Sequence, residues 1–198
     1  NLGLTFDGLD DYLAVDGLSS RVAEGQQFAV SVWFLPADGQ TGWGTVWSFH
    51  DAAGTNKLIL QAHREADGSF TLATYDDVAG RRNLFSGLPR GTWFHLALSF
   101  GTDDQIRAYL GYQAADGRDL NQTSAPLGIQ RAAAFPVAGG RFSLGQEWDG
   151  GSPSDFFKGD IDELRILRTA VDELDARLLY LEPPVARLAF DGPHKGVR

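Results

Sequence analysis

Three carboxylates, Glu147, Asp149 and Asp155, lie within nine residues of one another and are the side chains of this sequence best suited to chemistry. The pair Gly150-Gly151 between them lets the backbone curl so that the carboxylates converge. Calcium takes six to eight oxygen ligands and tolerates irregular geometry, whereas closely spaced carboxylates without a cation repel one another. The spacing therefore predicts a calcium-binding loop, and the alternative interpretation is an acidic surface loop.

Catalytic patterns are weak in comparison. The four histidines are scattered along the chain, and no Ser-His-Asp spacing or paired-His metal spacing emerges. His95 lies inside an apolar run beside Trp93 and is expected to be a hydrogen-bonded core or face residue. Four aromatic side chains would form a sugar-binding platform if they lined a concave face: Trp43, Trp47, Tyr75 and Tyr112.

Composition and charge narrow the classes of partner. The chain has 198 residues, a formal net charge of −9 and no cysteine. A negative net charge argues against a nucleic-acid partner, and the absence of cysteine excludes disulfides, thiolate zinc sites and cysteine nucleophiles. No apolar stretch approaches the roughly 20 residues of a membrane-spanning helix, so no transmembrane segment is expected.

Alternating apolar residues recur along the chain and predict strands that lie on a sheet. In Phe28–Pro36, the residues Phe28, Val30, Val32 and Phe34 share one face, and the other face is also largely apolar, so this strand should be internal. Similar runs with turn residues between many of them predict further strands at residues 45–49, 58–63, 69–75, 92–100, 105–111, 141–145, 159–167 and 185–190.

One segment near the end of the chain has helical periodicity. At residues 169–181, Val171, Leu174, Leu178 and Leu181 recur at spacings of three and four, and Thr169 with Asp172 resembles a capping box. Many short strands with one late helix predict an all-β fold, a two-sheet antiparallel jelly-roll β-sandwich. We expect one domain over residues 1–198, as a module of a larger protein.

Four segments, in order along the chain, resemble successive strands of the concanavalin A-like lectin and glucanase superfamily, in particular its laminin-G-like and pentraxin-like jelly rolls. They are residues 4–12, 28–36, 91–97 and 158–166. Leu144-Gly145-Gln146-Glu147-Trp148-Asp149, followed by residues 155–159, is similar to the calcium-binding loop of pentraxins. This resemblance implies carboxylate ligands from Glu147 and Asp149, a backbone carbonyl from Trp148 and a final side chain from Asp155.

The same resemblance implies a further ligand, Asn56, from a distant loop, where Thr55 replaces the usual aspartate and favours one ion over two. The Trp148 ring would either stack on a ligand or pack onto the sheet. A second cation site would form if Asp7, Asp10 or Asp11 met Asp160 or Asp162, because the family pairs these two strands. Asp160 and Asp162 share one strand face, although Asp10 and Asp11 also suit a turn.

Hydrolases of the superfamily carry paired glutamates in the order Glu-x-Asp-x-x-Glu, and Asp160-Ile161-Asp162-Glu163 lacks both of them. The expected function is therefore a non-catalytic, calcium-dependent module that binds a carbohydrate or another polar ligand outside the cell. The absence of cysteine suggests a bacterial member, a domain of an adhesin or a secreted enzyme. The alternatives are an adhesin domain with purely structural calcium and a glycoside hydrolase.

Overall fold

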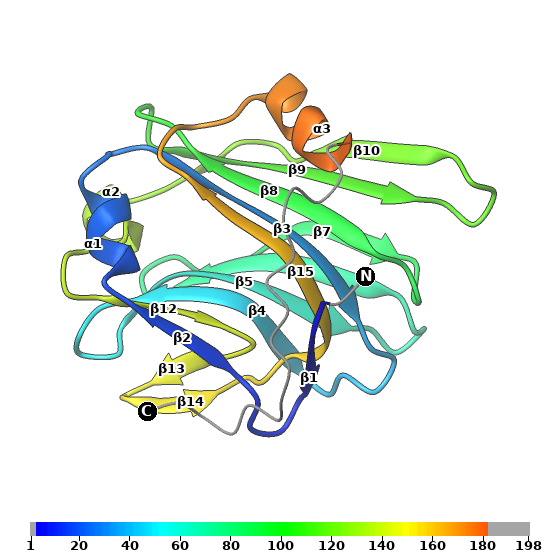
Figure 1. Ribbon diagram of the computed structural model, residues 1–198, viewed down its shortest axis with the longest axis horizontal. Coiled ribbons are helices and arrows are strands. Elements are labelled where there is room, and N and C mark those ends of the chain that lie inside the picture. The colour runs from blue at the N-terminus through cyan, green and yellow to red at the C-terminus, as the bar shows by residue number, and fades with distance from the viewer. Residues whose placement is uncertain (1–2, 182–198) are drawn as a thin grey trace.

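A computed structural model describes residues 3–181 and shows two packed antiparallel sheets (Figure 1). The first sheet has the strand order β1-β15-β3-β8-β9-β10, with β11 paired to β9, and the second has the order β2-β12-β4-β5-β6-β7. The bounds of the first sheet are β1 (Leu4–Asp7), β15 (Lys158–Leu167), β3 (Phe28–Pro36), β8 (Phe94–Phe100), β9 (Gln105–Gln113), β10 (Asp119–Thr123) and β11 (Leu127–Gly128). Those of the second are β2 (Leu13–Asp16), β12 (Arg141–Leu144), β4 (Trp43–His50), β5 (Asn56–Arg64), β6 (Phe70–Asp76) and β7 (Gly80–Leu88).

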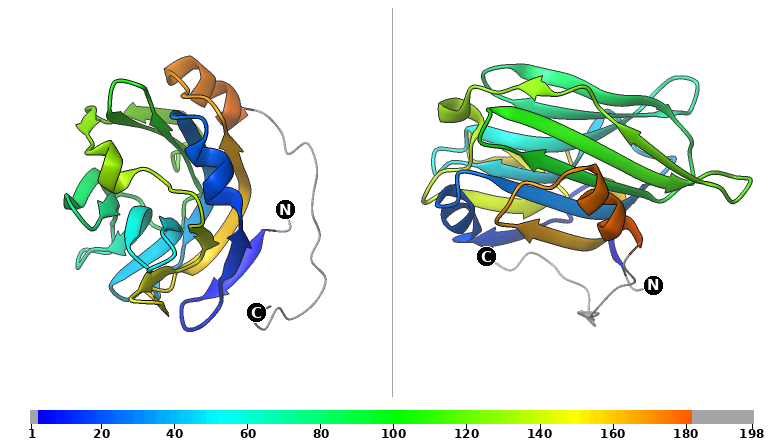
Figure 2. Two further views of the ribbon diagram at one scale, coloured as in Figure 1. Left: turned by 90° about the vertical axis from the view of Figure 1, so that its left-hand side faces the viewer. Right: turned by 90° about the horizontal axis from the view of Figure 1, so that it is seen from above.

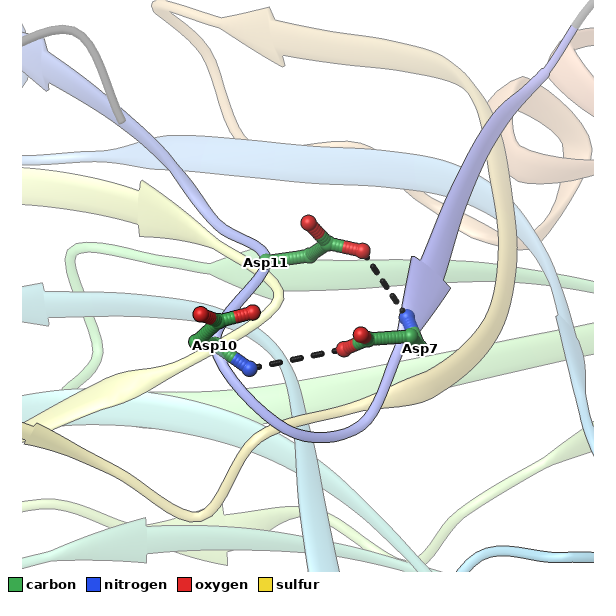
Figure 3. A group of neighbouring side chains, drawn as sticks. All are labelled: Asp7, Asp10 and Asp11. Atoms are coloured by element: carbon green, nitrogen blue, oxygen red, sulfur yellow. Dashed lines mark hydrogen bonds between the residues drawn. The ribbon is translucent and has the colours of Figure 1, made fainter. Parts of the chain in front are cut away.

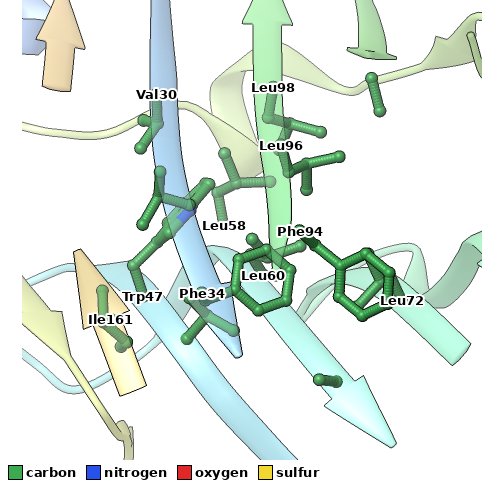
Figure 4. Packing of buried hydrophobic residues seen from close by; sticks show 14 of the residues in the cluster. Val30, Phe34, Trp47, Leu58, Leu60, Leu72, Phe94, Leu96, Leu98 and Ile161 are labelled. Carbon is green, nitrogen blue, oxygen red and sulfur yellow. The ribbon is translucent and has the colours of Figure 1, made fainter. Parts of the chain in front are cut away.

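The core lies between the inner faces of the two sheets (Figure 4). Phe28, Val30, Val32 and Phe34 of β3 are fully buried, as the alternation predicts. They pack in one cluster with residues of the facing strands, among them Trp47, Phe49, Leu58, Leu60, Leu72 and Phe142. Burial of this apolar surface is the main force that holds the sheets together. The predicted β-sandwich is confirmed.

The predicted strands within the described residues are confirmed, and the strand predicted at residues 185–190 lies outside them. The sequence analysis missed β2, β7 and β10, which lie at sheet edges. Edge strands are often polar or exposed on both faces, so they lack a clear apolar alternation. All four residues of β2 are exposed, and β10 reads Asp-Leu-Asn-Gln-Thr.

The structure contains the helices α1 (Leu18–Ala23), α2 (Arg131–Ala134) and α3 (Glu173–Leu181). Helix α3 lies on the outer side of the first sheet, next to β9 (Figures 1 and 2). It begins four residues later than predicted, because Asp172 and Asp175 form the cap: the Asp172 Oδ1 accepts the Asp175 N–H at 2.9 Å. No helix among the described residues is long and apolar enough to cross a membrane.

The leucines that predicted this helix do not face the sheet. Leu174, Leu178 and Leu181 are exposed, and Ala176 is the buried residue of α3. Tyr180 also contacts the sheet, with its ring stacked on Trp33 at a centroid distance of 5.1 Å. The helix therefore packs through Ala176, the partly buried Leu179 and the Tyr180 ring, while Leu174, Leu178 and Leu181 lie on its solvent side.

His95 lies on this outer face, as a buried side chain that is hydrogen-bonded to Ser31. The distance from its Nε2 to the Ser31 Oγ is 2.7 Å, and the residue is 2 % exposed. Burial, assisted by the positive charge of Arg165, lowers the pKa of His95 to about 4. The expectation that His95 is a hydrogen-bonded core or face residue is confirmed.

We expect His95 to make the fold less stable as the pH falls. An unfolded chain protonates its imidazole near pH 6.5, whereas the folded protein resists protonation down to about pH 4. The unfolded state therefore binds the extra proton in this window, and His95 alone should lower the free energy of unfolding by about 3 kcal/mol between pH 7 and pH 4. Urea unfolding at both pH values would measure the change. The His95→Gln variant should lose this part of the pH dependence and Ser31→Ala should retain it. An identical pH dependence in His95→Gln and the unchanged protein would contradict this assignment.

Candidate functional site

The segment that carries the three predicted carboxylates folds over the outer face of the second sheet. Its strands β13 (Glu147–Asp149) and β14 (Ser152–Ser154) form a hairpin whose turn is Gly150-Gly151, and both glycines have positive φ. The predicted curl at these glycines is confirmed. The segment then returns to β4, where the Thr45 N–H donates to the Asp155 carbonyl at 2.8 Å.

Two distant segments meet beneath this hairpin. The Asn56 Nδ2 donates to the Glu147 Oε2 at 3.1 Å, and the Gln61 Nε2 donates to the Asp155 Oδ2 at 3.0 Å. Glu147 is only 6 % exposed. Burial, together with the negative charges of Asp155 and Asp149, raises the pKa of Glu147 to about 8. Burial likewise raises the pKa of Asp155. Both raised pKa values mean that ionising Glu147 and Asp155 together is unfavourable here unless a cation compensates their charge.

Asp149 lies further out, exposed beside the glycine turn. Among residues 3–181, only Asp7, Asp10 and Asp11 bring three carboxylate oxygens within 4.8 Å of one another. The carboxylate oxygens of Glu147, Asp149 and Asp155 therefore lie further apart than that. A cation that used all three would have to draw Asp149 inward. The glycine turn gives the backbone the freedom to allow that movement.

The donor set of the hairpin fits a hard divalent cation. Asn56 is 3 % exposed, and its Oδ1 is buried with no hydrogen-bond partner. An unpaired buried oxygen is unfavourable unless a cation or water satisfies it. Pro153 lies opposite Trp148 in the hairpin and has no N–H, so it donates nothing to the Trp148 carbonyl. Glu147, Asp149, Asp155, Asn56 and the Trp148 carbonyl could therefore hold calcium.

The two loops that bring these ligands together touch through glycines. Gly54 precedes Asn56 in the turn between β4 and β5, and it has a φ of 82°. A Cβ at Gly54 would lie 2.7 Å from the backbone N of Gly151, which is too close for any side chain. Direct contact between the two backbones therefore sets the spacing between the Asn56 turn and the hairpin.

Trp148 and two of the four candidate platform aromatics, Trp47 and Tyr112, are buried. The Trp148 ring is 9 % exposed, and its Nε1 donates to the Ser143 Oγ at 2.9 Å, so the ring packs onto the sheet. It also packs edge-on against Tyr12. Trp47 and Tyr112 therefore belong to the core between the sheets, and Trp148 follows the second of its two alternatives, packing onto the sheet.

Trp43 and Tyr75 do lie beside the carboxylate cluster, where they surround an arginine that the sequence analysis missed. The Arg81 Cζ lies 4.2 Å from the centroid of the Trp43 ring and 5.5 Å from that of Tyr75. The Arg81 Nε donates to the Gln61 Oε1 at 3.0 Å. The positive charge of Arg81 opposes the rise in the pKa of Glu147. A polar glutamine inside the apolar run 58–63 was the one sequence feature that could have indicated Gln61 as a site residue. No sequence feature indicated Arg81.

The predicted second cation site divides into separate groups. Asp7, Asp10 and Asp11 cluster in one turn, where the Asp7 Oδ1 accepts the backbone N–H of Asp10 and the Asp11 Oδ2 accepts that of Asp7 (Figure 3). These bonds indicate a turn-forming role.

The strand that should supply the rest of this second site does pair with β1 as predicted. However, the Asp160 Oδ1 accepts the Thr5 hydroxyl at 2.6 Å, and the Asp162 Oδ1 accepts the Glu163 N–H. Neither aspartate joins the described group of three.

The sequence model of the concanavalin A-like lectin/glucanases superfamily matches residues 7–175. The chain belongs to this superfamily. This match confirms the predicted resemblance. No curated protein sequence matches the chain.

Several solved structures have the same β-sandwich fold as this chain, although their sequences differ widely from it. The heptameric SAP-like pentraxin from Limulus polyphemus is 17 % identical, with a TM-score of 0.61 over 87 % of this chain and 78 % of that chain. The Ruminococcus gnavus IT-sialidase CBM40 is 12 % identical, with a TM-score of 0.58 over 89 % and 92 %. The Trypanosoma rangeli sialidase is 15 % identical, with a TM-score of 0.62 over 91 % of this chain but 27 % of that one. These neighbours include a carbohydrate-binding module and an enzyme.

Proposed function

We propose that this domain is a non-catalytic, calcium-dependent carbohydrate-binding module that acts outside the cell. The observation that carries the proposal is the meeting of Glu147 and Asp155 with Asn56, whose buried Oδ1 has no partner. Extracellular calcium is abundant enough to fill even weak sites. Bound there, calcium would offer open coordination positions to ligand hydroxyls.

Two neighbours support a glycan as the ligand. The CBM40 module, which covers nearly the same length as this chain, is described in complex with alpha2,3 sialyllactose. The pentraxin shares the fold over most of both chains. Since similar folds carry different functions, the proposal depends on the local cluster, and the neighbours only make a sugar the first ligand to test.

Glycan-array binding in calcium, in a chelator and after calcium is restored tests the proposal. We expect binding that the chelator abolishes and calcium restores. Binding that survives chelation would contradict the role of the metal. If no glycan binds but calcium still raises the melting temperature, the domain is a structural or protein-interaction part of an adhesin.

A glycoside hydrolase is the second candidate, because Glu147 and Asp155 form a carboxylate pair. A general acid must reach the glycosidic oxygen, and Glu147 is 6 % exposed beneath the hairpin, which favours binding over hydrolysis. Turnover of soluble β-glucans that is lost in one carboxylate variant would support the enzyme.

A further inference from the structure

Arg81 presents its charged group at the surface beside the carboxylate cluster, in a fixed orientation. The residue lies on the edge strand β7 and is exposed, yet its guanidinium lies over the Trp43 ring at 4.2 Å and near the Tyr75 ring at 5.5 Å. Its Nε donates to the Gln61 Oε1 at 3.0 Å. Cation–π contacts and one hydrogen bond thus restrict a side chain that would otherwise sample many rotamers.

The acceptor that holds Arg81 is itself immobilised. Gln61 is fully buried, and its Nε2 donates to the Asp155 Oδ2 at 3.0 Å and to the Thr45 Oγ1 at 3.3 Å. Ala73 lies opposite Gln61 on β6, the strand that Arg81 crosses, and its small side chain leaves room for the arginine. One amide therefore connects the proposed cation ligand Asp155 to the guanidinium and sets their relative positions.

Two nitrogen atoms of this guanidinium are available to hydrogen-bond a ligand. Among the described residues, the Nη1 and Nη2 of Arg81 have no hydrogen-bond or ion-pair partner. The next residue, Arg82, contrasts with it: its Nη2 pairs with Asp76 at 3.0 Å and its Nη1 donates to the Gly128 carbonyl. Two free, coplanar donors match the two oxygens of a carboxylate.

We propose that Arg81 binds the carboxylate of an acidic sugar, whose hydroxyls would contact the calcium ion proposed to lie among Glu147, Asp155 and Asn56. This inference rests on the proposed carbohydrate-binding function and specifies its ligand class. The net charge of −9 gives no general attraction to anions, so recognition of an acidic ligand depends on local pairing. A neutral sugar would leave the two donors of Arg81 to water.

Matched ligands that differ only in charge provide the test. We suggest titrating the domain, in calcium, with an oligogalacturonate and its methyl ester, and with 3′-sialyllactose and the methyl ester of its sialic acid. A hydrogen-bonded charge pair predicts that each acid binds roughly tenfold or more tightly than its ester. This comparison needs no variant, so it stands even if a substitution disturbs the fold.

Three variants assign the preference to Arg81. Arg81→Gln should bind acid and ester equally. Arg81→Lys retains the charge without the planar fork and should lose most of the preference. Arg118→Gln makes the same charge change at an exposed ion pair in the turn between β9 and β10, and should behave like the unchanged protein. Melting temperatures would verify that each variant is folded.

The outcomes separate this inference from the proposed function. Equal binding of acid and ester by the unchanged protein, or a preference that persists in Arg81→Gln, would overturn the role of Arg81 and leave carbohydrate binding intact. An absence of binding to these ligands and to a neutral glycan array would overturn the proposed function and this inference with it.

Discussion

The Glu147→Gln variant should lose the thermal stabilisation that calcium gives to the unchanged domain. A ligand at about 100 times its Kd stabilises a protein by about 2.7 kcal/mol. For a domain of this size, that corresponds to a rise in melting temperature of about 5–10 °C. Calorimetric melting with calcium and with a chelator would measure the shift, which should be near zero in the variant.

The same substitution should leave the metal-free domain as stable or more stable. Glu147 is buried among like charges, and burial with Asp155 and Asp149 raises its pKa to about 8. Glutamine keeps the shape and the acceptor for the Asn56 amide while it removes this repulsion. A merely structural glutamate would behave differently, since its loss would destabilise the domain with or without calcium.

A control variant completes this experiment. Glu173→Gln removes one negative charge from the exposed start of α3, on the other sheet, and should retain the full calcium shift. If Glu147→Gln also retained the full shift, the calcium site would not be at this hairpin.

The Gly145→Ala variant should be strongly destabilised. Gly145 has a φ of 80°, and a Cβ there would lie 2.4 Å from the Cδ1 of Phe6, a core residue. Its carbonyl also accepts the Phe157 N–H at 2.9 Å. We expect the free energy of unfolding to fall by about 3 kcal/mol or more, from left-handed strain and overpacking together. Urea unfolding would measure this loss.

Gly139 provides a matched control for this substitution. Its φ is 79°, but a Cβ there would have open space around it. Gly139→Ala should therefore lose only about 1–2 kcal/mol, the conformational term. Equal losses in the two variants would mean that the contact with Phe6 contributes nothing. A larger loss at Gly145 would show how tightly the start of the Gln146-Glu147-Trp148-Asp149 segment is tied to the core.

The internal strands could be predicted because their burial on both sides leaves long apolar alternations, as in Phe28–Pro36. The face of α3 that contacts the sheet could not be predicted. The periodic residues Leu174, Leu178 and Leu181 face solvent, whereas contact with the sheet is made by Ala176, Leu179 and Tyr180, whose packing depends on what the sheet presents. Periodicity identifies a helix without revealing which side its neighbours cover.

The candidate site shows the same limit. Glu147 and Asp155 are close in sequence, so their meeting was predictable, and a family resemblance supplied Asn56, whereas Asp149 lies further out than its spacing suggests. Gln61 and Arg81 come from other strands and reach the cluster across the sheet. Only the register of β5, β6 and β7 places them there, and no local pattern encodes that register.

The close approach of Gly54 to Gly151 limits the distance between the Asn56 turn and the hairpin. Because a Cβ at position 54 would meet the Gly151 backbone, larger residues there would push the Asn56 turn away from the hairpin. The aperture that remains would then suit ions of greater radius. Graded substitutions at this one position should therefore change the ion radius that the proposed calcium site accepts, without altering any ligand.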